Sequence, residues 1–151
     1  MNDTAAAATE GGEDATVQLF LASTLYGAAT LAAAIDSGAF GERAARRILL
    51  VSTNTPTPET STPLSAAPGF APLARRFDEV LDWNATIQPQ HPAAWAPQPD
   101  DTPIWERLLR DRWGLGDAPV RLVVESIQGN PARAVVDVFA DSTVDVYADG
   151  L

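Results

Sequence analysis

The chain has 151 residues and a formal net charge of −10, from 20 acidic and 10 basic residues. A chain of this length can form one domain with a buried core. The acidic excess argues against duplex nucleic acid or an anionic membrane as the main partner, because both require a cationic protein face. The lack of cysteine excludes thiolate chemistry, and the single histidine, His91, cannot build an imidazole cluster, so we expect no metal.

The first 15 residues are rich in Ala and Gly and carry only acidic charges, a composition typical of a disordered leader. The uncharged stretch 15–35 is long enough for a membrane span, which needs roughly 20 apolar residues. A signal peptide, however, needs a cationic leader. Ser23-Thr24 also interrupts the stretch where a strand would turn into a helix. The sequence therefore predicts a buried strand and helix, not a transmembrane segment.

Short continuous apolar runs in the first half predict strands covered on both faces, at 17–22, 48–51 and 79–81. A helix is expected over 25–37, where apolar and small residues recur at helical spacing, and a shorter one over 72–77. The Pro-rich segment 54–68 is expected to be a long loop that holds neither helix nor strand.

A second Pro-rich connection, 88–101, leads to Asp101-Thr102-Pro103, which predicts a capped helix start with Pro at an early position. Gly114 or Gly116 would end this helix. Its expected buried side comprises Ile104, Trp105, Leu108, Leu109 and Trp113.

The last part of the chain is typical of a strand-helix-strand unit. A strand is expected over 121–125 and another over 143–147. Between them, Asn130-Pro131 predicts a helix start, in which Asn130 would cap the first free N–H groups. The apolar stripe of that helix would comprise Val135, Val136 and Phe139.

The succession of these elements over residues 16–151 predicts an α/β, Rossmann-like domain. Its doubly wound parallel sheet would have about five strands in the order 3-2-1-4-5. The carboxyl ends of parallel strands meet at one edge, and ligands bind where the winding direction reverses. That edge would gather polar residues, namely Ser23, Thr24, Ser52, Thr53, Asn54, Glu125, Ser126, Asp149 and Gly150.

Neither a G-x-G-x-x-G fingerprint nor a Walker loop occurs, so NAD and ATP are poorly supported as cofactors. Asp149-Gly150 has two interpretations. A carboxylate at a strand end can act as a general base toward a hydroxyl, with Gly allowing close approach of a substrate. Asp-Gly is also a common turn, and local spacing alone favours the turn.

Several segments between Val17 and Leu151 form a combined pattern: Leu19–Gly27, Ile48–Ser52, Trp83–Ile87 with His91-Pro92, Trp105–Arg110, Leu122–Gln128, Asn130–Ala132 and Val146–Leu151. Together they resemble the N-terminal half of the bacterial alpha-2,8-polysialyltransferase family. The resemblance implies the N-terminal Rossmann-like domain of a GT-B glycosyltransferase, with the C-terminal donor domain absent from this chain. It implies transfer of sialic acid from CMP-sialic acid to a glycan acceptor in the cytoplasm, without a further cofactor. It leaves room for peripheral membrane association or oligomer formation.

The resemblance also assigns roles to residues. Related bacterial sialyltransferases carry an acidic-acidic-Gly motif whose second acid is the proposed general base. The motif would fall on Ala148-Asp149-Gly150, so Asp149 is the expected base, although Ala replaces the first acid. Contacts to the acceptor or nucleotide are expected from Ser23, Thr24, Glu125, Ser126, Asn130 and Gly150, while helix capping explains Asn130 equally well.

Those families also bind the CMP phosphate with a His-Pro motif that follows the acidic motif. His91-Pro92 precedes Asp149, so we expect His91 to be an exposed loop histidine. Two alternatives to a sialyltransferase stay open. One is an inactive remnant or a nucleotide- or sugar-binding module, and the other is a sugar- or nucleotide-modifying Rossmann enzyme outside the sialyl group.

Overall fold

The structure, a computed structural model, describes residues 16–41 and 46–147. The predicted leader, 1–15, and the predicted site residues Asp149 and Gly150 lie outside the described residues. A parallel sheet of five strands forms the centre, in the order β3-β2-β1-β4-β5. The predicted parallel sheet and its strand order are therefore confirmed. The strands are β1 (Val17–Ala22), β2 (Arg46–Val51), β3 (Glu79–Asp82), β4 (Val120–Val124) and β5 (Thr143–Val146).

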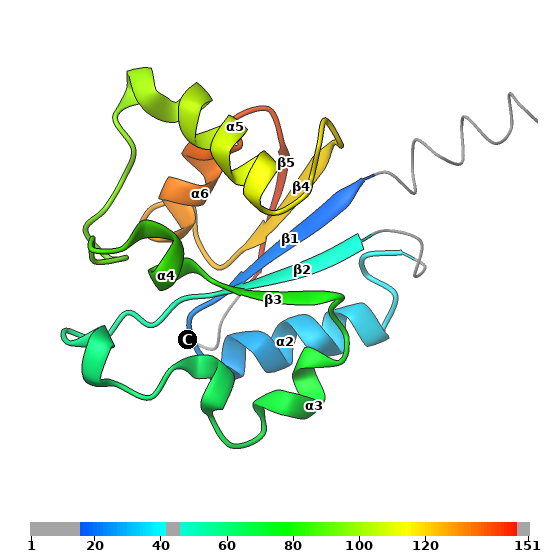
Figure 1. The fold of residues 1–151 in the computed structure, drawn as a ribbon. Helices are drawn as coiled ribbons and strands as arrows, with labels where there is room; N and C mark the ends of the chain where they lie inside the picture. Colours follow the sequence, from blue (N-terminus) through cyan, green and yellow to red (C-terminus); the bar gives the residue numbers. More distant parts are fainter. Residues whose placement is uncertain (1–15, 42–45, 148–151) are drawn as a thin grey trace, which may run out of the picture.

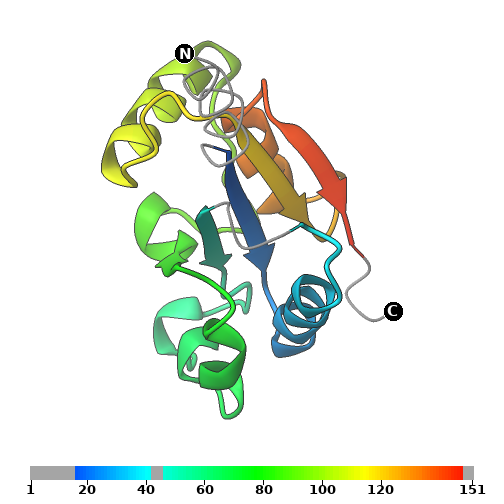
Figure 2. The same ribbon diagram turned by 90° about the vertical axis from the view of Figure 1, so that its right-hand side faces the viewer.

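Helices cover both faces of the sheet, as Figure 1 shows. One face carries α2 (Leu25–Asp36) and α3 (Phe70–Ala74), and the other carries α4 (Trp83–Ile87), α5 (Thr102–Arg112) and α6 (Ala132–Val138). The strand arrows point the same way in Figure 2, so the carboxyl ends of the strands share one edge, at the left of Figure 1. The fold is an α/β fold.

The core has two layers because successive strand residues point to opposite faces of the sheet. In β1, Leu19 and Leu21 contact the α5 and α6 layer, whereas Phe20 packs with α2 and α3. All three are at most 1% exposed, which explains why the strand runs are continuously apolar.

The uncharged stretch folds as predicted, with β1 followed by α2. Thr24 caps α2 by accepting a hydrogen bond from Gly27 N at 2.9 Å. Tyr147, which follows β5, donates to the buried Leu21 carbonyl at 2.7 Å and lies directly over Gly27. Among the described helices, none combines the length and apolarity that crossing a membrane demands.

The predicted buried side of α5 is wrong at two positions. Leu109 and Trp113 are 0% and 5% exposed, whereas Ile104 and Leu108 are 67% and 41% exposed. The buried residues recur four apart, together with the half-buried Trp105, so one stripe of the helix faces α6 and the sheet. Ile104 and Leu108 lie next to that stripe and line a hollow of about 1030 Å³ along the outer face of α5. Gly114, with a positive φ of 66°, follows the helix end as expected.

The predicted cap at Asn130 is wrong, whereas Asp101 is the cap position of α5 as predicted but does not cap through its side chain. A 3-10 turn, η3 (Pro99–Asp101), runs directly into α5, and the Asp101 side chain makes no capping hydrogen bond. At α6 the cap position is Pro131, after a cis peptide bond from Asn130, and no side chain caps the helix. Asn130 Oδ1 is instead buried without a hydrogen-bond partner among the described residues.

The Pro-rich loop 54–68, predicted to hold neither helix nor strand, contains two 3-10 turns, η1 (Pro58–Thr60) and η2 (Leu64–Ala66). In η1, Pro58 occupies an early position, where its missing N–H costs nothing. The short helix expected over 72–77 begins earlier, at Phe70. Helix α4 was not predicted; Asp82 caps it by accepting from Ala85 N at 3.4 Å.

Candidate functional site

A chain of hydrogen bonds crosses the carboxyl edge of the sheet between β2 and β4. Ser23, after β1, donates to Glu125 Oε1, after β4, at 2.8 Å. Asn54 Nδ2 donates to Ser23 Oγ at 3.1 Å, and its Oδ1 accepts from the buried Ser52 hydroxyl at 2.7 Å. The direction of donation therefore runs from β2 to the Glu125 carboxylate. We call Ser23, Ser52, Asn54 and Glu125 the edge cluster.

The other predicted site residues of this edge make local hydrogen bonds. Thr24 caps α2, and Ser126 Oγ accepts from Gln128 N at 3.1 Å within the loop between β4 and α6. Asn130 lies in the same loop. The structure thus brings Ser23 and Glu125 together by a direct hydrogen bond, whereas the side chains of Thr24 and Ser126 bind backbone N–H groups.

A hollow of about 590 Å³ opens beside the carboxyl ends of β2 and β3. One wall is the loop that follows β2, and the other is the end of β3 with α4 and the residues after it. We call it the edge hollow. The described residues that line it are Thr53, Pro58, Glu59, Ser61, Pro63, Asp82, Asn84, Gln88, Pro89 and Gln90.

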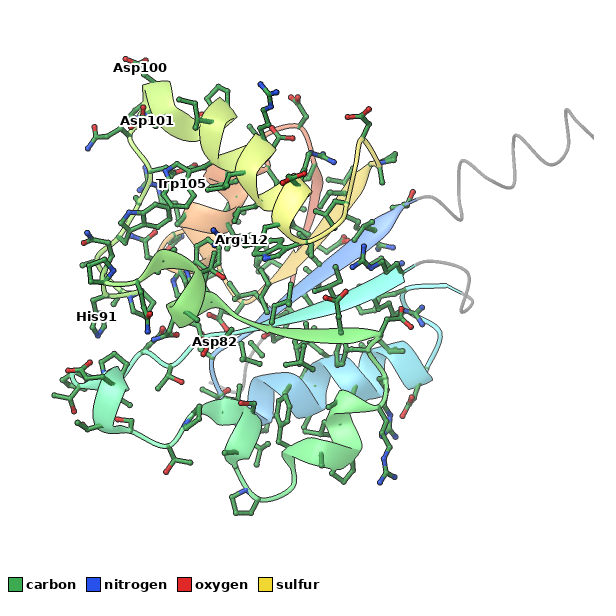
Figure 3. All side chains as sticks on the ribbon, viewed as in Figure 1. Asp82, His91, Asp100, Asp101, Trp105 and Arg112 are labelled. Atoms are coloured by element: carbon green, nitrogen blue, oxygen red, sulfur yellow. The ribbon has the colours of Figure 1, made fainter. Side chains whose placement is uncertain are left out.

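The two walls are joined by hydrogen bonds. The Asn84 side chain accepts from Thr53 N at 2.8 Å and donates to Thr53 O at 2.9 Å, like a pairing strand. His91 Nδ1 accepts from Ala93 N at 3.0 Å, so its other ring nitrogen, Nε2, carries the proton that is donated to Thr55 O at 2.8 Å. Figure 3 shows Asp82 and His91 on the side where these loops lie. The hollow therefore has fixed walls.

His91 was expected to be an exposed loop histidine. It does lie in a loop, but it is half-buried and links the wall after α4 to the wall after β2. His91 therefore helps to hold the two walls of the edge hollow together.

The chemistry of the edge hollow is that of hydroxyls, amides and carboxylates. Its described lining contains Glu59 and Asp82 but neither Arg nor Lys. Such a lining can accept hydrogen bonds from a polyhydroxylated molecule and donate hydrogen bonds to it. A bound phosphate, by contrast, requires cations or backbone N–H groups. Within residues 16–41 and 46–147, no group of three or more His, Asp or Glu could hold a metal ion.

Of the described residues that line this hollow, the sequence prediction named only Thr53 at the carboxyl edge, and the hollow itself was missed. Asp82 and Asn84 follow the third predicted strand directly, so the rule that sites gather at carboxyl ends could have identified them. Glu59 gives no comparable signal, because it lies within a Pro-rich loop whose path depends on contacts distant in sequence.

The sheet and its two helical layers define an α/β protein with a doubly wound parallel sheet. In comparisons with known proteins, the chain matches no family model, no curated protein and no solved structure.

Proposed function

We propose that the chain is the acceptor-side domain of a glycosyltransferase of the sialyltransferase type, the N-terminal domain of a GT-B arrangement. One observation carries the proposal: segments that resemble the polysialyltransferase family, although far apart in sequence, meet at the carboxyl edge. Ser23, Ser52, Asn84 and Glu125 come from four of these segments and lie in the edge cluster or the edge hollow. Ligand sites of doubly wound folds occur at this edge.

In this proposal the acceptor glycan lies against the carboxyl edge, and Asp149 removes the proton from its reacting hydroxyl. The hydroxyl oxygen then attacks the anomeric carbon of CMP-sialic acid through an oxocarbenium-like transition state. The bond from the anomeric carbon to the phosphate oxygen breaks, CMP leaves with the electron pair, and the anomeric configuration inverts. Ser23 and Glu125 would orient the acceptor, since the edge cluster fixes both side chains.

The donor would be held mainly by a second domain, as the resemblance implies. The absence of Arg and Lys among the described residues that line the edge hollow supports this division, because CMP-sialic acid carries a phosphate and a carboxylate. The acceptor and the donor would then meet in the cleft between two domains.

Sialyl transfer from CMP-sialic acid to a panel of glycans tests the proposal, with protein expressed from the complete reading frame. Asp149→Ala should lower the rate about 10²- to 10⁴-fold, the usual contribution of a general base. Asp141→Ala, which removes an exposed carboxylate beyond α6, is the matched control and should retain the wild-type rate. Full activity of Asp149→Ala would remove the base assignment. A wild-type protein that neither transfers sialic acid nor binds glycans would refute the proposal.

A second candidate is a sugar-binding module without catalysis, or an inactive remnant. The same lack of basic residues in the described lining favours it, because a hollow without cations can hold a sugar while lacking a donor site. Calorimetric titration of protein expressed from the complete reading frame, with CMP and with an oligosaccharide, separates the candidates. Binding of CMP by that protein would contradict the remnant, whereas oligosaccharide binding without CMP binding or sialyl transfer would support the module.

A further inference from the structure

The edge hollow has a charge pattern that constrains its ligand. Glu59 is exposed in η1 on one wall, and Asp82 is exposed at the end of β3 on the other. The remaining described lining residues are uncharged. An entering anion would therefore meet carboxylates on both walls and no compensating cation.

An uncharged sugar suits the same lining. Each sugar hydroxyl donates one hydrogen bond and accepts others. The carboxylates of Glu59 and Asp82 can accept from hydroxyls, and the amides of Gln88 and Gln90 can both donate and accept. The Asn84 amide is already used by the Thr53 backbone, so its contribution is to hold the wall in place.

The size and rigidity of the hollow also fit a small ligand. Its volume of about 590 Å³ lies within the range of roughly 300–1,000 Å³ that is usual for small-molecule sites. The Asn84–Thr53 and His91–Thr55 hydrogen bonds join the walls, and Ser61 is tied to Thr55 at 2.7 Å. Walls fixed before binding lower the entropic cost of holding a ligand.

We propose that the edge hollow binds an uncharged sugar residue of the acceptor glycan. This inference rests on the proposed function and makes it more specific. Sialic acid would then be transferred onto neutral glycans.

The test compares lactose with α-2,8-linked disialic acid, two disaccharides that differ in charge. Each is titrated into the isotopically labelled full chain while amide chemical shifts are followed by NMR. We expect lactose to bind at least about five times more tightly and to shift the amides of Thr53 and Asn84, which line the hollow.

Reversing one wall charge provides a second readout. Glu59→Lys should strengthen disialic acid binding about 5- to 10-fold and weaken lactose binding, and the gain should shrink at high salt because exposed charges are screened. Asp100→Lys makes the same charge change at an exposed position in η3. This residue lies at the far end of the α5 layer (Figure 3), and its variant should bind both disaccharides as the wild type does.

The outcomes separate the two proposals. Disialic acid binding in the hollow at least as tightly as lactose would overturn the neutral-sugar inference and leave the acceptor-side function standing. Lactose binding that shifts amides only outside the hollow would also overturn the inference. If neither disaccharide binds, the neutral-sugar inference is refuted, and the transfer assay with the glycan panel decides the acceptor-side function separately.

Discussion

Gly27 allows Tyr147 to reach the first strand, and replacing it with Ala should destabilise the fold. A Cβ atom at Gly27 would lie 3.1 Å from Tyr147 Oη and 3.2 Å from Thr24 Oγ1. Tyr147 would have to move, and its 2.7 Å hydrogen bond to Leu21 O would be weakened or lost. Gly27 is helical, so Ala would ordinarily stabilise the protein at this position.

The size of the effect follows from two opposing contributions. Leaving the buried Leu21 carbonyl without its hydroxyl partner costs about 2 kcal/mol. The higher helix propensity of Ala contributes about 1 kcal/mol in the opposite direction. Gly27→Ala should therefore lower the free energy of unfolding by about 1 kcal/mol.

A double-mutant cycle with Tyr147→Phe tests whether the contact with the Tyr147 hydroxyl causes the loss of stability. In the Phe background the phenolic oxygen is gone, so Gly27→Ala should become neutral or stabilising by up to about 1 kcal/mol. Urea unfolding followed by far-UV circular dichroism measures each free energy. An equal effect of Gly27→Ala in both backgrounds, or stabilisation in the wild type, would refute the steric explanation.

Three further substitutions probe the core and the site. Leu109→Ala should lower the free energy of unfolding in urea by about 3 kcal/mol, because the side chain is fully buried. Arg47→Met should lower it by about 2–3 kcal/mol, since the 2% exposed guanidinium donates to Gln18 Oε1 and to the carbonyls of Phe40 and Gly41. Asn84→Ala should speed hydrogen exchange at Thr53 N–H, whose acceptor it removes, and cost about 1–2 kcal/mol.

Matched controls identify the cause in each case. Ile104→Ala, on the exposed side of the same helix, should change stability by less than about 0.5 kcal/mol, and a loss equal to that of Leu109→Ala would contradict the observed orientation of α5. Arg46→Met removes a partly exposed guanidinium and should cost less than Arg47→Met. Unchanged exchange at Thr53 in Asn84→Ala would show that the amide does not hold that wall.

The sheet was predictable because its strands are buried on both faces. Runs such as Leu19–Leu21 are apolar at every position, which a half-exposed strand would not be. With short connections and right-handed crossovers, the alternation of strands and helices leaves few possible orders, and the structure has the predicted one.

The helices that were mispredicted depend on tertiary contacts. Helix α4 consists of Trp-Asn-Ala-Thr-Ile, mostly residues of modest helix propensity, and forms with Trp83 and Ile87 buried under the sheet layer. Along α5, Ile104 with Leu108 and Leu109 with Trp113 are both apolar pairs four apart. The sequence alone does not decide which pair faces the core.

One part of the candidate site was predictable from the sequence and the other part was not. Contact between Ser23 and Glu125 follows from the sheet order, since each residue comes directly after one of two neighbouring strands. The edge hollow could not be derived, because its loop wall is positioned by hydrogen bonds to Asn84 and His91, some 30 residues away in sequence. The sequence pattern therefore predicts where a strand ends but does not predict the path of the loop that follows it.

The tryptophans are distributed unequally between the two layers of the core. Trp105, Trp95, Trp83, Trp113 and Phe139 form a continuous series of ring contacts, with centroids 4.9–6.5 Å apart, in the α5 and α6 layer. The chain has four tryptophans, so all of them lie there, whereas Tyr147 packs with the α2 layer. Tryptophan fluorescence will therefore report on one side of the sheet. If the α2 layer opens first during unfolding, the fluorescence will not change until the sheet itself separates.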